Sequence, residues 1–291
     1  MNRHQEVMFN QKHFIMLCAA LAATGALVAP STGMAGNYTL SSGGSSAILN
    51  LGDSTGGTGN LGMNNWDVGT GNQLNQQWFW YSIDGATPTS IDQLPGEVLS
   101  TSYAGANDLT VSYVNSQVSI NVEYHLHGDG VGSDSADMME YIWVDNVSGS
   151  TINNFTFYQY SNFNLLGNNN NTVNISGSPG AYTAANQTTG GPGGTGIAEV
   201  IVAPTAVGGE AGLAASTLSD VENGSLNGNL GPVTGNVAWA FQWAETIDAG
   251  GEMDILKDKG LEVMTIPEPS TVPLIALGMV ALGLTLRRKL A

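Results

Sequence analysis

The sequence predicts an all-β protein, an antiparallel, jelly-roll-like β-sandwich with long Gly- and Asn-rich loops. Residues 118–126 place apolar side chains at even positions, the period of a half-buried strand. Residues 237–247 place large aromatic side chains on one face and small or polar ones on the other, typical of an antiparallel sheet with one packed side. Turn-forming Gly, Asn and Ser separate such segments, and only residues 210–221 show a helical pattern.

The individual elements follow from local composition. A Gly-, Ser- and Asn-rich lead over residues 37–71 precedes the first strand signals, and we expect the Asn-, Gly- and Thr-rich stretch over residues 161–194 to be a long loop. Alternation or aromatic content, bounded by turn residues such as Asp84 and Gly85, marks the strands. The strands expected cover residues 77–83, 108–114, 118–126, 140–147, 154–160, 196–202, 237–247 and 252–263.

Charge is distributed unevenly along the chain. Only 7 Lys and Arg residues stand against 24 Asp and Glu residues, a net charge of -17. All the basic residues except Lys257 and Lys259 lie in the two terminal segments, so the body is more anionic than the whole chain. Such a surface repels phosphate backbones, which excludes nucleic acid as a partner. It suits an exported, soluble protein.

The chain has a single cysteine, Cys18, in the apolar N-terminal run. A body without cysteine has no disulfide, no thiolate nucleophile and no Cys-ligated zinc. Its stability must therefore come from the packed core, and the sequence indicates no cofactor.

Residues 1–35 have the pattern of a secretory signal peptide. Arg3 and Lys12 precede an apolar run over residues 14–28, and small residues follow up to Ala35. We expect signal peptidase to cleave after Ala35, which leaves residues 36–265 as an extracellular β-sandwich domain.

Residues 266–291 combine three features in a fixed order. Pro267, Glu268 and Pro269 precede an apolar segment over residues 272–286, and Arg287, Arg288 and Lys289 follow as a basic stop. A helix over the apolar segment spans about 22 Å at about 1.5 Å per residue, short of a bilayer core of about 30 Å. The basic end belongs on the cytoplasmic side, which leaves the body outside.

This C-terminal segment resembles the PEP-CTERM sorting signal of Gram-negative, exopolysaccharide-producing bacteria, also labelled an ice-binding protein C-terminal motif. The resemblance rests on Pro267-Glu268-Pro269, the apolar stretch with its glycines, and Arg287-Arg288-Lys289. It implies an exosortase that cleaves near the Pro-Glu-Pro motif. It also implies an inner-membrane anchor before processing and a cell-surface or matrix location afterwards. A single-pass anchor that is never cut remains the alternative.

The stretch from His125 to Asp137 is the densest group of potential ligands. Asp129, Asp134 and Asp137 follow two histidines in what we expect to be a flexible loop. Calcium takes six to eight oxygen ligands, which clustered aspartates and backbone carbonyls can supply, although the EF-hand spacing is missing. The alternatives are a histidine-based transition-metal site and a solvated hairpin end.

Catalytic patterns are weak in this sequence. Glu123 and Glu245 lie on aromatic-rich strands and are the least random carboxylate pair for glycoside hydrolysis. No G-x-S-x-G elbow accompanies the serines and histidines. Aromatic residues offer either a sugar-stacking platform or core packing, and the candidates are Trp66, Trp78, Trp80, Tyr81, Trp143, Trp239 and Trp243.

We therefore expect an exported, non-enzymatic surface or matrix protein that is structural and associated with exopolysaccharide. A carbohydrate- or calcium-binding adhesive module is the alternative, and a secreted hydrolase is the third interpretation. Its expected partners are signal peptidase, the exosortase, the membrane through the C-terminal helix before processing, and exopolysaccharide.

Overall fold

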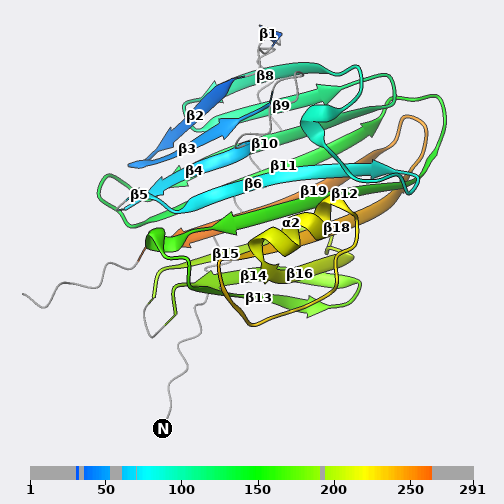
Figure 1. Cartoon of the computed structure of the whole chain (residues 1–291). Helices are drawn as coiled ribbons and strands as arrows, with labels where there is room; N and C mark the ends of the chain where they lie inside the picture. Colours follow the sequence, from blue (N-terminus) through cyan, green and yellow to red (C-terminus); the bar gives the residue numbers. More distant parts are fainter. Residues whose placement is uncertain (1–30, 33–35, 53–60, 70, 191–193, 264–291) are drawn as a thin grey trace, which may run out of the picture.

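The chain folds as a sandwich of two antiparallel sheets, which confirms the predicted fold class (Figure 1). The computed structural model describes residues 31–32, 36–52, 61–69, 71–190 and 194–263. The sheets lie face to face with their strands running in similar directions, as in an aligned sandwich.

The ten-stranded sheet has the order β1-β8-β9-β10-β11-β19-β15-β14-β13-β17. Its strands are β1 (Ser31–Thr32), β8 (Val98–Gly105), β9 (Asp108–Val114), β10 (Val118–Gly128), β11 (Ser135–Asn146), β13 (Asn171–Ser178), β14 (Ala181–Thr188), β15 (Gly196–Ala203), β17 (Val233–Gly235) and β19 (Glu252–Glu262). The long strands β10, β11 and β19 occupy its middle.

The nine-stranded sheet has the order β16-β18-β12-β6-β4-β3-β2, with β5 paired to β4 and β7 paired to β6. Its strands are β2 (Asn37–Ser42), β3 (Ser45–Asn50), β4 (Gly62–Val68), β5 (Gly71–Asn72), β6 (Leu74–Ile83), β7 (Thr89–Ser90), β12 (Ile152–Phe163), β16 (Gly208–Leu213) and β18 (Val237–Ile247). Two short 3-10 turns, η1 (Ile91–Gln93) and η2 (Leu165–Gly167), lie in the connections.

Helix α2 (Ala214–Glu222) packs on the outer face of the nine-stranded sheet, against β12, β16 and β18. On β18 the residues that alternate with the large aromatic ones include Ala238 and Ala240, both buried. Small side chains there let the helix approach the sheet, and Tyr160 on β12 donates a hydrogen bond from its hydroxyl to the carbonyl of Ala214. One sheet is therefore covered by a helix on its outer side.

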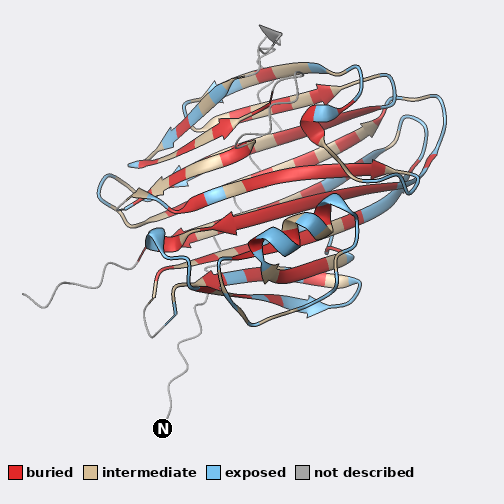
Figure 2. Ribbon diagram, viewed as in Figure 1, coloured by how far each residue is buried: buried red, intermediate tan, exposed pale blue. Residues whose placement is uncertain are grey.

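The core lies between the two sheets and is rich in aromatic rings. Phe163 stacks on Trp239 with ring centroids 5.4 Å apart, and Phe79 stacks on Phe157 at 5.3 Å. Such offset pairs add to the stabilisation that burial gives. Figure 2 shows buried residues along the central strands and exposed ones mainly in the connections and on α2.

Two stretches to which no strand was assigned are largely strands, so the prediction of a long loop over residues 161–194 was wrong. The lead over residues 37–71 forms β2, β3 and β4, and the stretch over residues 161–194 forms the end of β12 together with β13 and β14. β2 and β13 lie at or next to sheet edges, where pairing needs backbone hydrogen bonds but little apolar burial. Gly, Asn and Ser therefore suffice there, and composition alone could not separate these strands from loops.

Element boundaries also differ from the expected ones. Strand β11 begins at Ser135, so Asp137 lies on a strand and not in a flexible loop. The helix begins at Ala214, because residues 208–213 pair with β18 as β16. Strands β9 and β18 have the bounds that their alternation predicts.

Glycines allow the two hairpin ends at one rim of the sandwich to touch. A Cβ on Gly43 would lie 2.0 Å from the carbonyl oxygen of Gly128, and a Cβ on Gly128 would lie 2.1 Å from that of Ser42. Gly43 also has a φ of 53°, in the left-handed region. Only glycine permits this close approach of the backbones.

The predicted signal helix, the Pro-Glu-Pro motif and the C-terminal membrane helix lie outside the described residues. Within the described ranges, no helix is both long and apolar enough to cross a bilayer.

Candidate functional site

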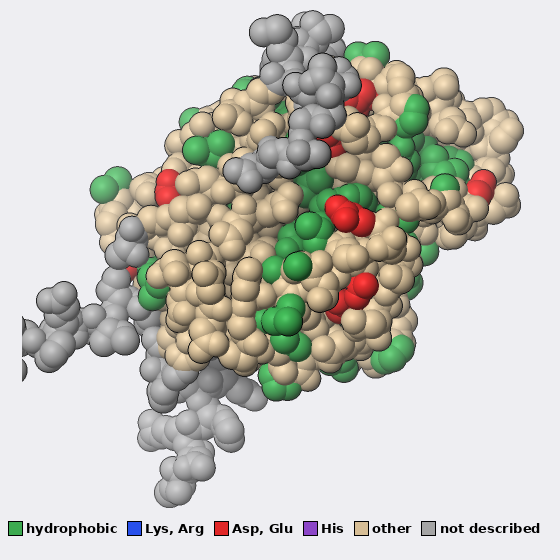
Figure 3. Space-filling view, in the orientation of Figure 1, with side chains coloured by type: hydrophobic (Ala, Val, Ile, Leu, Met, Phe, Trp, Pro, Cys, Tyr) green, Lys and Arg blue, Asp and Glu red, His purple; other side chains and the backbone are tan. Residues whose placement is uncertain are grey.

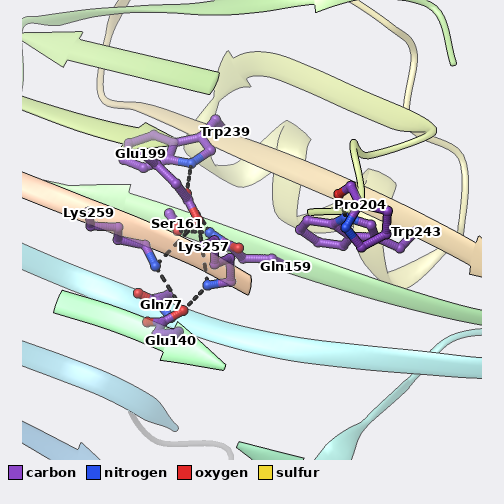
Figure 4. A network of polar contacts seen from close by, with 10 residues as sticks. All are labelled: Gln77, Glu140, Gln159, Ser161, Glu199, Pro204, Trp239, Trp243, Lys257 and Lys259. Atoms are coloured by element: carbon purple, nitrogen blue, oxygen red, sulfur yellow. Dashed lines mark hydrogen bonds and ion pairs between the residues drawn. The ribbon is translucent and has the colours of Figure 1, made fainter. Parts of the chain in front are cut away.

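Four charged side chains meet in the core between the sheets, and we call them the buried ion cluster: Glu140, Glu199, Lys257 and Lys259. All four are fully buried. Lys257 pairs with Glu140 in close contact, and Lys259 Nζ lies 2.9 Å from Glu140 Oε2 and 3.4 Å from Glu199 Oε1. Lys257 Nζ is also 3.5 Å from Glu199 Oε1. Two positive and two negative groups thus form one neutral unit (Figure 4).

The opposite sheet supplies the remaining hydrogen bonds of both carboxylates. Gln77 on β6 donates from Nε2 to Glu140 Oε1 at 2.6 Å. Gln159 on β12 and Trp239 on β18 each donate to Glu199 Oε2 at 2.6 Å. The cluster therefore joins three strands of each sheet, with its charges on the ten-stranded sheet and its neutral donors on the other.

Burial dominates the electrostatics of this unit. It lowers the pKa of Lys257 well below the ordinary lysine range, and the charge of Lys259 lowers it further. Lys257 Nζ also lies 5.0 Å from the ring centroid of Phe79, so an aromatic face bounds the amine on one side. Among the described residues, the carboxylates of Glu140 and Glu199 are the groups of opposite charge that pair with the Lys257 amine.

Sequence reasoning missed the cluster, although the sequence carries a signal for it. Glu140 stands between Met138 and Ile142 at core-facing positions of β11. Lys257 and Lys259 likewise occupy core-facing positions of β19. A charged residue in phase with the apolar face of a strand predicts a buried, paired charge, because an unpaired one is too costly.

The position of the two lysines determines the charge of the surface. They are the only Lys or Arg residues within the described ranges, and both are in the core. Figure 3 shows the side that carries α2, where acidic and hydrophobic side chains are visible among the described residues but no Lys, Arg or His is. Surface cations of the described part are limited to histidines when protonated.

The outer face of the ten-stranded sheet carries a different pattern. Strand pairing aligns residues of β10, β11 and β19 in four rows across the sheet. We call these twelve residues the outer-face strip, and the rows are Asn121–Trp143–Asp254, Glu123–Tyr141–Leu256, His125–Met139–Asp258 and His127–Asp137–Gly260. Its central column on β11 is mainly apolar, and hydrogen-bonding side chains flank it. The only α-helix among the described residues packs on the other sheet.

Two aromatic side chains lie half-buried in the strip. Tyr141 and Trp143 stack with ring centroids 5.2 Å apart and planes at 25°. The Tyr141 hydroxyl donates a 2.5 Å hydrogen bond to Asp254 Oδ1, which fixes its ring. Burial and the neighbouring Asp254 raise the pKa of Tyr141, so it stays a neutral donor.

The predicted aromatic platform divides between the core and this face. Trp143 is the single predicted member that lies on the strip, and Tyr141 beside it was not among the residues proposed. The other six are buried, as the core-packing alternative required: Trp66, Trp78, Trp80, Tyr81, Trp239 and Trp243.

The three aspartates of the predicted calcium site lie around the β10–β11 hairpin, but they point in different directions. Asp129 accepts a hydrogen bond from Ser135 and lies 3.7 Å from His127 Nε2. Asp134 faces Gly69, where an added Cβ would lie 2.6 Å from its Oδ1. Over the described part of the chain, no three His, Cys, Asp or Glu side chains form a group suited to a metal ion. Calcium binding at Asp129, Asp134 and Asp137 stays a prediction.

Acidic side chains on this face raise the pKa of neighbouring carboxyl groups. The pKa of Asp137 is raised from 3.8 to about 6, first by burial and then by the charges of Asp258 and Asp129. Burial and Asp108 likewise raise the pKa of Glu123. His125 pairs with Asp108 on the adjacent strand. Acidic side chains therefore outnumber basic ones around Glu123, Asp137 and Asp258.

The predicted carboxylate pair for hydrolysis is separated by the sandwich. Glu123 lies on β10 of the ten-stranded sheet, and Glu245 lies exposed on β18 of the other sheet. A different pair, Asp92 and Glu97, lies where the chain crosses between the sheets. Burial, followed by the charge of Asp92, raises the pKa of Glu97 to about 7.

Comparison with known families identifies the C-terminal segment. Residues 265–289 match the PEP-CTERM protein-sorting motif, as the resemblance of this segment implied. The match implies an exported protein with a C-terminal sorting signal that an exosortase recognises. No curated protein matches the chain in sequence.

Solved structures share the fold of the body. A bacterial glucoamylase complexed with acarbose aligns at a TM-score of 0.51 and 11% identity, over 85% of this chain. The aligned part spans only 36% of the glucoamylase. A protein described provisionally as a kojibiose phosphorylase from the human microbiome aligns at 0.45 and 10% identity, over 84% of this chain and 32% of its own. The first likeness shows the β-sandwich fold alone.

Replacing one lysine of the buried ion cluster tests its energetic role. Lys259→Met leaves a buried negative charge without its partner, and we expect a loss of about 3–5 kcal/mol in the free energy of unfolding. The double variant Lys259→Met/Glu199→Gln restores neutrality and keeps an oxygen that accepts from Gln159 and Trp239. It should recover part of the loss in urea unfolding. Equal stability of Lys259→Met and wild type would refute a role for charge balance.

The raised pKa of Asp137 predicts a dependence of stability on pH. The folded state binds this proton more tightly than the unfolded state, so the free energy of unfolding falls as pH rises from about 4 to about 6. Asp137→Asn removes that contribution. Urea unfolding at intervals from pH 4 to pH 7 should show the stability of the variant rising relative to that of wild type between about pH 4 and about pH 6. Above that range the difference in the free energy of unfolding should stay constant. A constant difference at every pH would contradict the shift.

Proposed function

We propose that the chain is an exported, non-catalytic surface or matrix protein that binds neutral exopolysaccharide on the outer-face strip. The observation that carries this proposal is the half-buried Tyr141–Trp143 pair on the outer face of the ten-stranded sheet. Sugar rings present apolar C–H faces that pack on aromatic rings and hydroxyl edges that need hydrogen-bond partners. The strip offers both, because acidic side chains such as Glu123 and Asp254 flank its apolar column.

Surface charge favours a neutral polysaccharide over an acidic one. The surface of the described chain has no Lys or Arg to pair with uronate or sulfate groups. Like charges across an interface oppose association. A neutral glycan meets no such barrier, and its hydroxyls can donate to Asp254 and Glu123.

The sorting motif supports the location of this activity. A chain that an exosortase recognises is exported before it meets its ligand. We propose that cleavage near Pro267-Glu268-Pro269 removes the membrane segment and releases the body to the cell surface or matrix. The absence of catalysis is part of the same proposal, since Glu123 and Glu245 lie on different sheets.

Substitution of the aromatic pair tests the proposal. We expect Trp143→Ala and Tyr141→Ala each to weaken binding to a neutral polysaccharide at least about tenfold, which corresponds to about 1.4 kcal/mol. Tyr103→Ala is the matched control, because Tyr103 is an exposed aromatic residue on β8, away from the strip. Affinity electrophoresis in gels that contain neutral, acidic or amino-bearing polysaccharides gives the readout.

Two results would contradict the proposal. One is wild-type protein that no neutral polysaccharide retards. The other is equal retardation of Trp143→Ala and wild type, which would place the binding surface elsewhere.

A further inference from the structure

The buried ion cluster brings an amine and a carboxyl group into contact inside the core. Lys257 and Glu140 are directly opposed on the paired strands β19 and β11. Both side chains are fully buried and touch each other. We propose that Lys257 and Glu140 condense to an isopeptide bond that links β11 covalently to β19.

The environment of Lys257 supplies a nucleophile. An amine attacks a carboxyl carbon only in its neutral form. Burial and the nearby charge of Lys259 favour that form in Lys257, whose pKa lies well below the ordinary lysine range. Transfer of its proton to Glu140 turns an ion pair into a neutral amine and a neutral acid, and an apolar surrounding favours neutral partners.

The environment of Glu140 supplies an activated electrophile. Gln77 Nε2 donates to Glu140 Oε1 at 2.6 Å from the opposite sheet. A donor placed at this oxygen stabilises the negative charge that develops on it when an amine adds to the carbon. Lys259 Nζ lies 2.9 Å from the other oxygen, Oε2, and is positioned to give it a proton.

The two glutamates differ in a way that selects Glu140. Glu199 Oε2 accepts hydrogen bonds from both Gln159 and Trp239. Its other oxygen, Oε1, lies 3.5 Å from Lys257 Nζ and 3.4 Å from Lys259 Nζ. Glu140 has a single neutral donor, and it is the carboxylate that Lys257 Nζ touches.

The atoms balance without any further reactant. The Nζ of Lys257 forms a bond to Cδ of Glu140, and the bond from Cδ to Oε2 breaks. Lys259 gives a proton to the departing oxygen and regains one from Lys257 Nζ, so one water molecule leaves. An amide and the Lys259–Glu199 ion pair remain, and the cluster stays neutral.

Such a bond would serve a protein whose body has no cysteine for a disulfide. It would hold together two central strands of the ten-stranded sheet, directly beneath the outer-face strip. The inference is independent of the proposed ligand, because it rests on the core alone.

Peptide mapping of the purified, denatured full chain tests the proposal. Pepsin digestion and tandem mass spectrometry should give a branched peptide that contains both Glu140 and Lys257, about 18 Da lighter than the sum of its two parts. Lys257→Arg keeps a cation but offers no amine for the reaction, so its digest should contain only linear peptides.

Wild-type protein decides the question even if the variant does not fold. Linear, unmodified peptides that cover Glu140 and Lys257 in the wild-type digest would overturn the proposal. A branched peptide that joins Lys259 in place of Lys257 would overturn the assignment of the nucleophile.

Discussion

The interaction on which the remaining structure depends is the neutral cluster of two glutamates and two lysines between the sheets. Each charge is removed from water, so each needs a partner at hydrogen-bonding distance. These partners come from β11, β15 and β19 on one side, and neutral donors come from β6, β12 and β18 on the other. A shift of one residue in any of the charged strands would turn its charge outward and leave the others unpaired. The cluster thus couples the register of the strands within one sheet to the docking of the two sheets.

The same cluster shapes the surface. With both lysines inside, the described exterior is anionic apart from its histidines, which disfavours polyanions as ligands. The outer faces of the two sheets differ in the groups that lie on them. Helix α2 covers part of the nine-stranded sheet, while the ten-stranded sheet presents Tyr141 and Trp143 between polar columns. In the proposed function, this charge disfavours acidic polysaccharides, and the aromatic pair supplies the contact for a neutral one.

The sequence predicts the central strands and the fold class because their burial is periodic. Strand β18 shows this best: its aromatic residues face the core at alternate positions, and its bounds match. Strand β2 at one sheet edge and strand β13 next to another were missed because backbone pairing, which leaves no mark in hydrophobicity, holds them in place. Likewise, Trp143 could be named from the sequence as an aromatic candidate, but its place beside Asp254 depends on the pairing of β11 with β19.

The buried ion cluster could have been found from the alternation of apolar residues along the strands alone. Glu140 and the two lysines break an apolar alternation at positions that must face the core. The contact between Glu199 and Trp239 could not have been found in this way, because it joins strands of different sheets. Sequence patterns show which face a residue occupies, whereas the docking of the sheets decides what it meets.

Acrylamide quenching of tryptophan fluorescence tests the central claim, that the outer-face strip binds a glycan, most directly. The chain has 6 tryptophans, and all except Trp143 are at most 7% exposed. A saturating neutral polysaccharide should remove the quenchable component, and Trp143→Phe should lack that component from the start. Polysaccharide binding that leaves Trp143 as accessible as before would contradict the account.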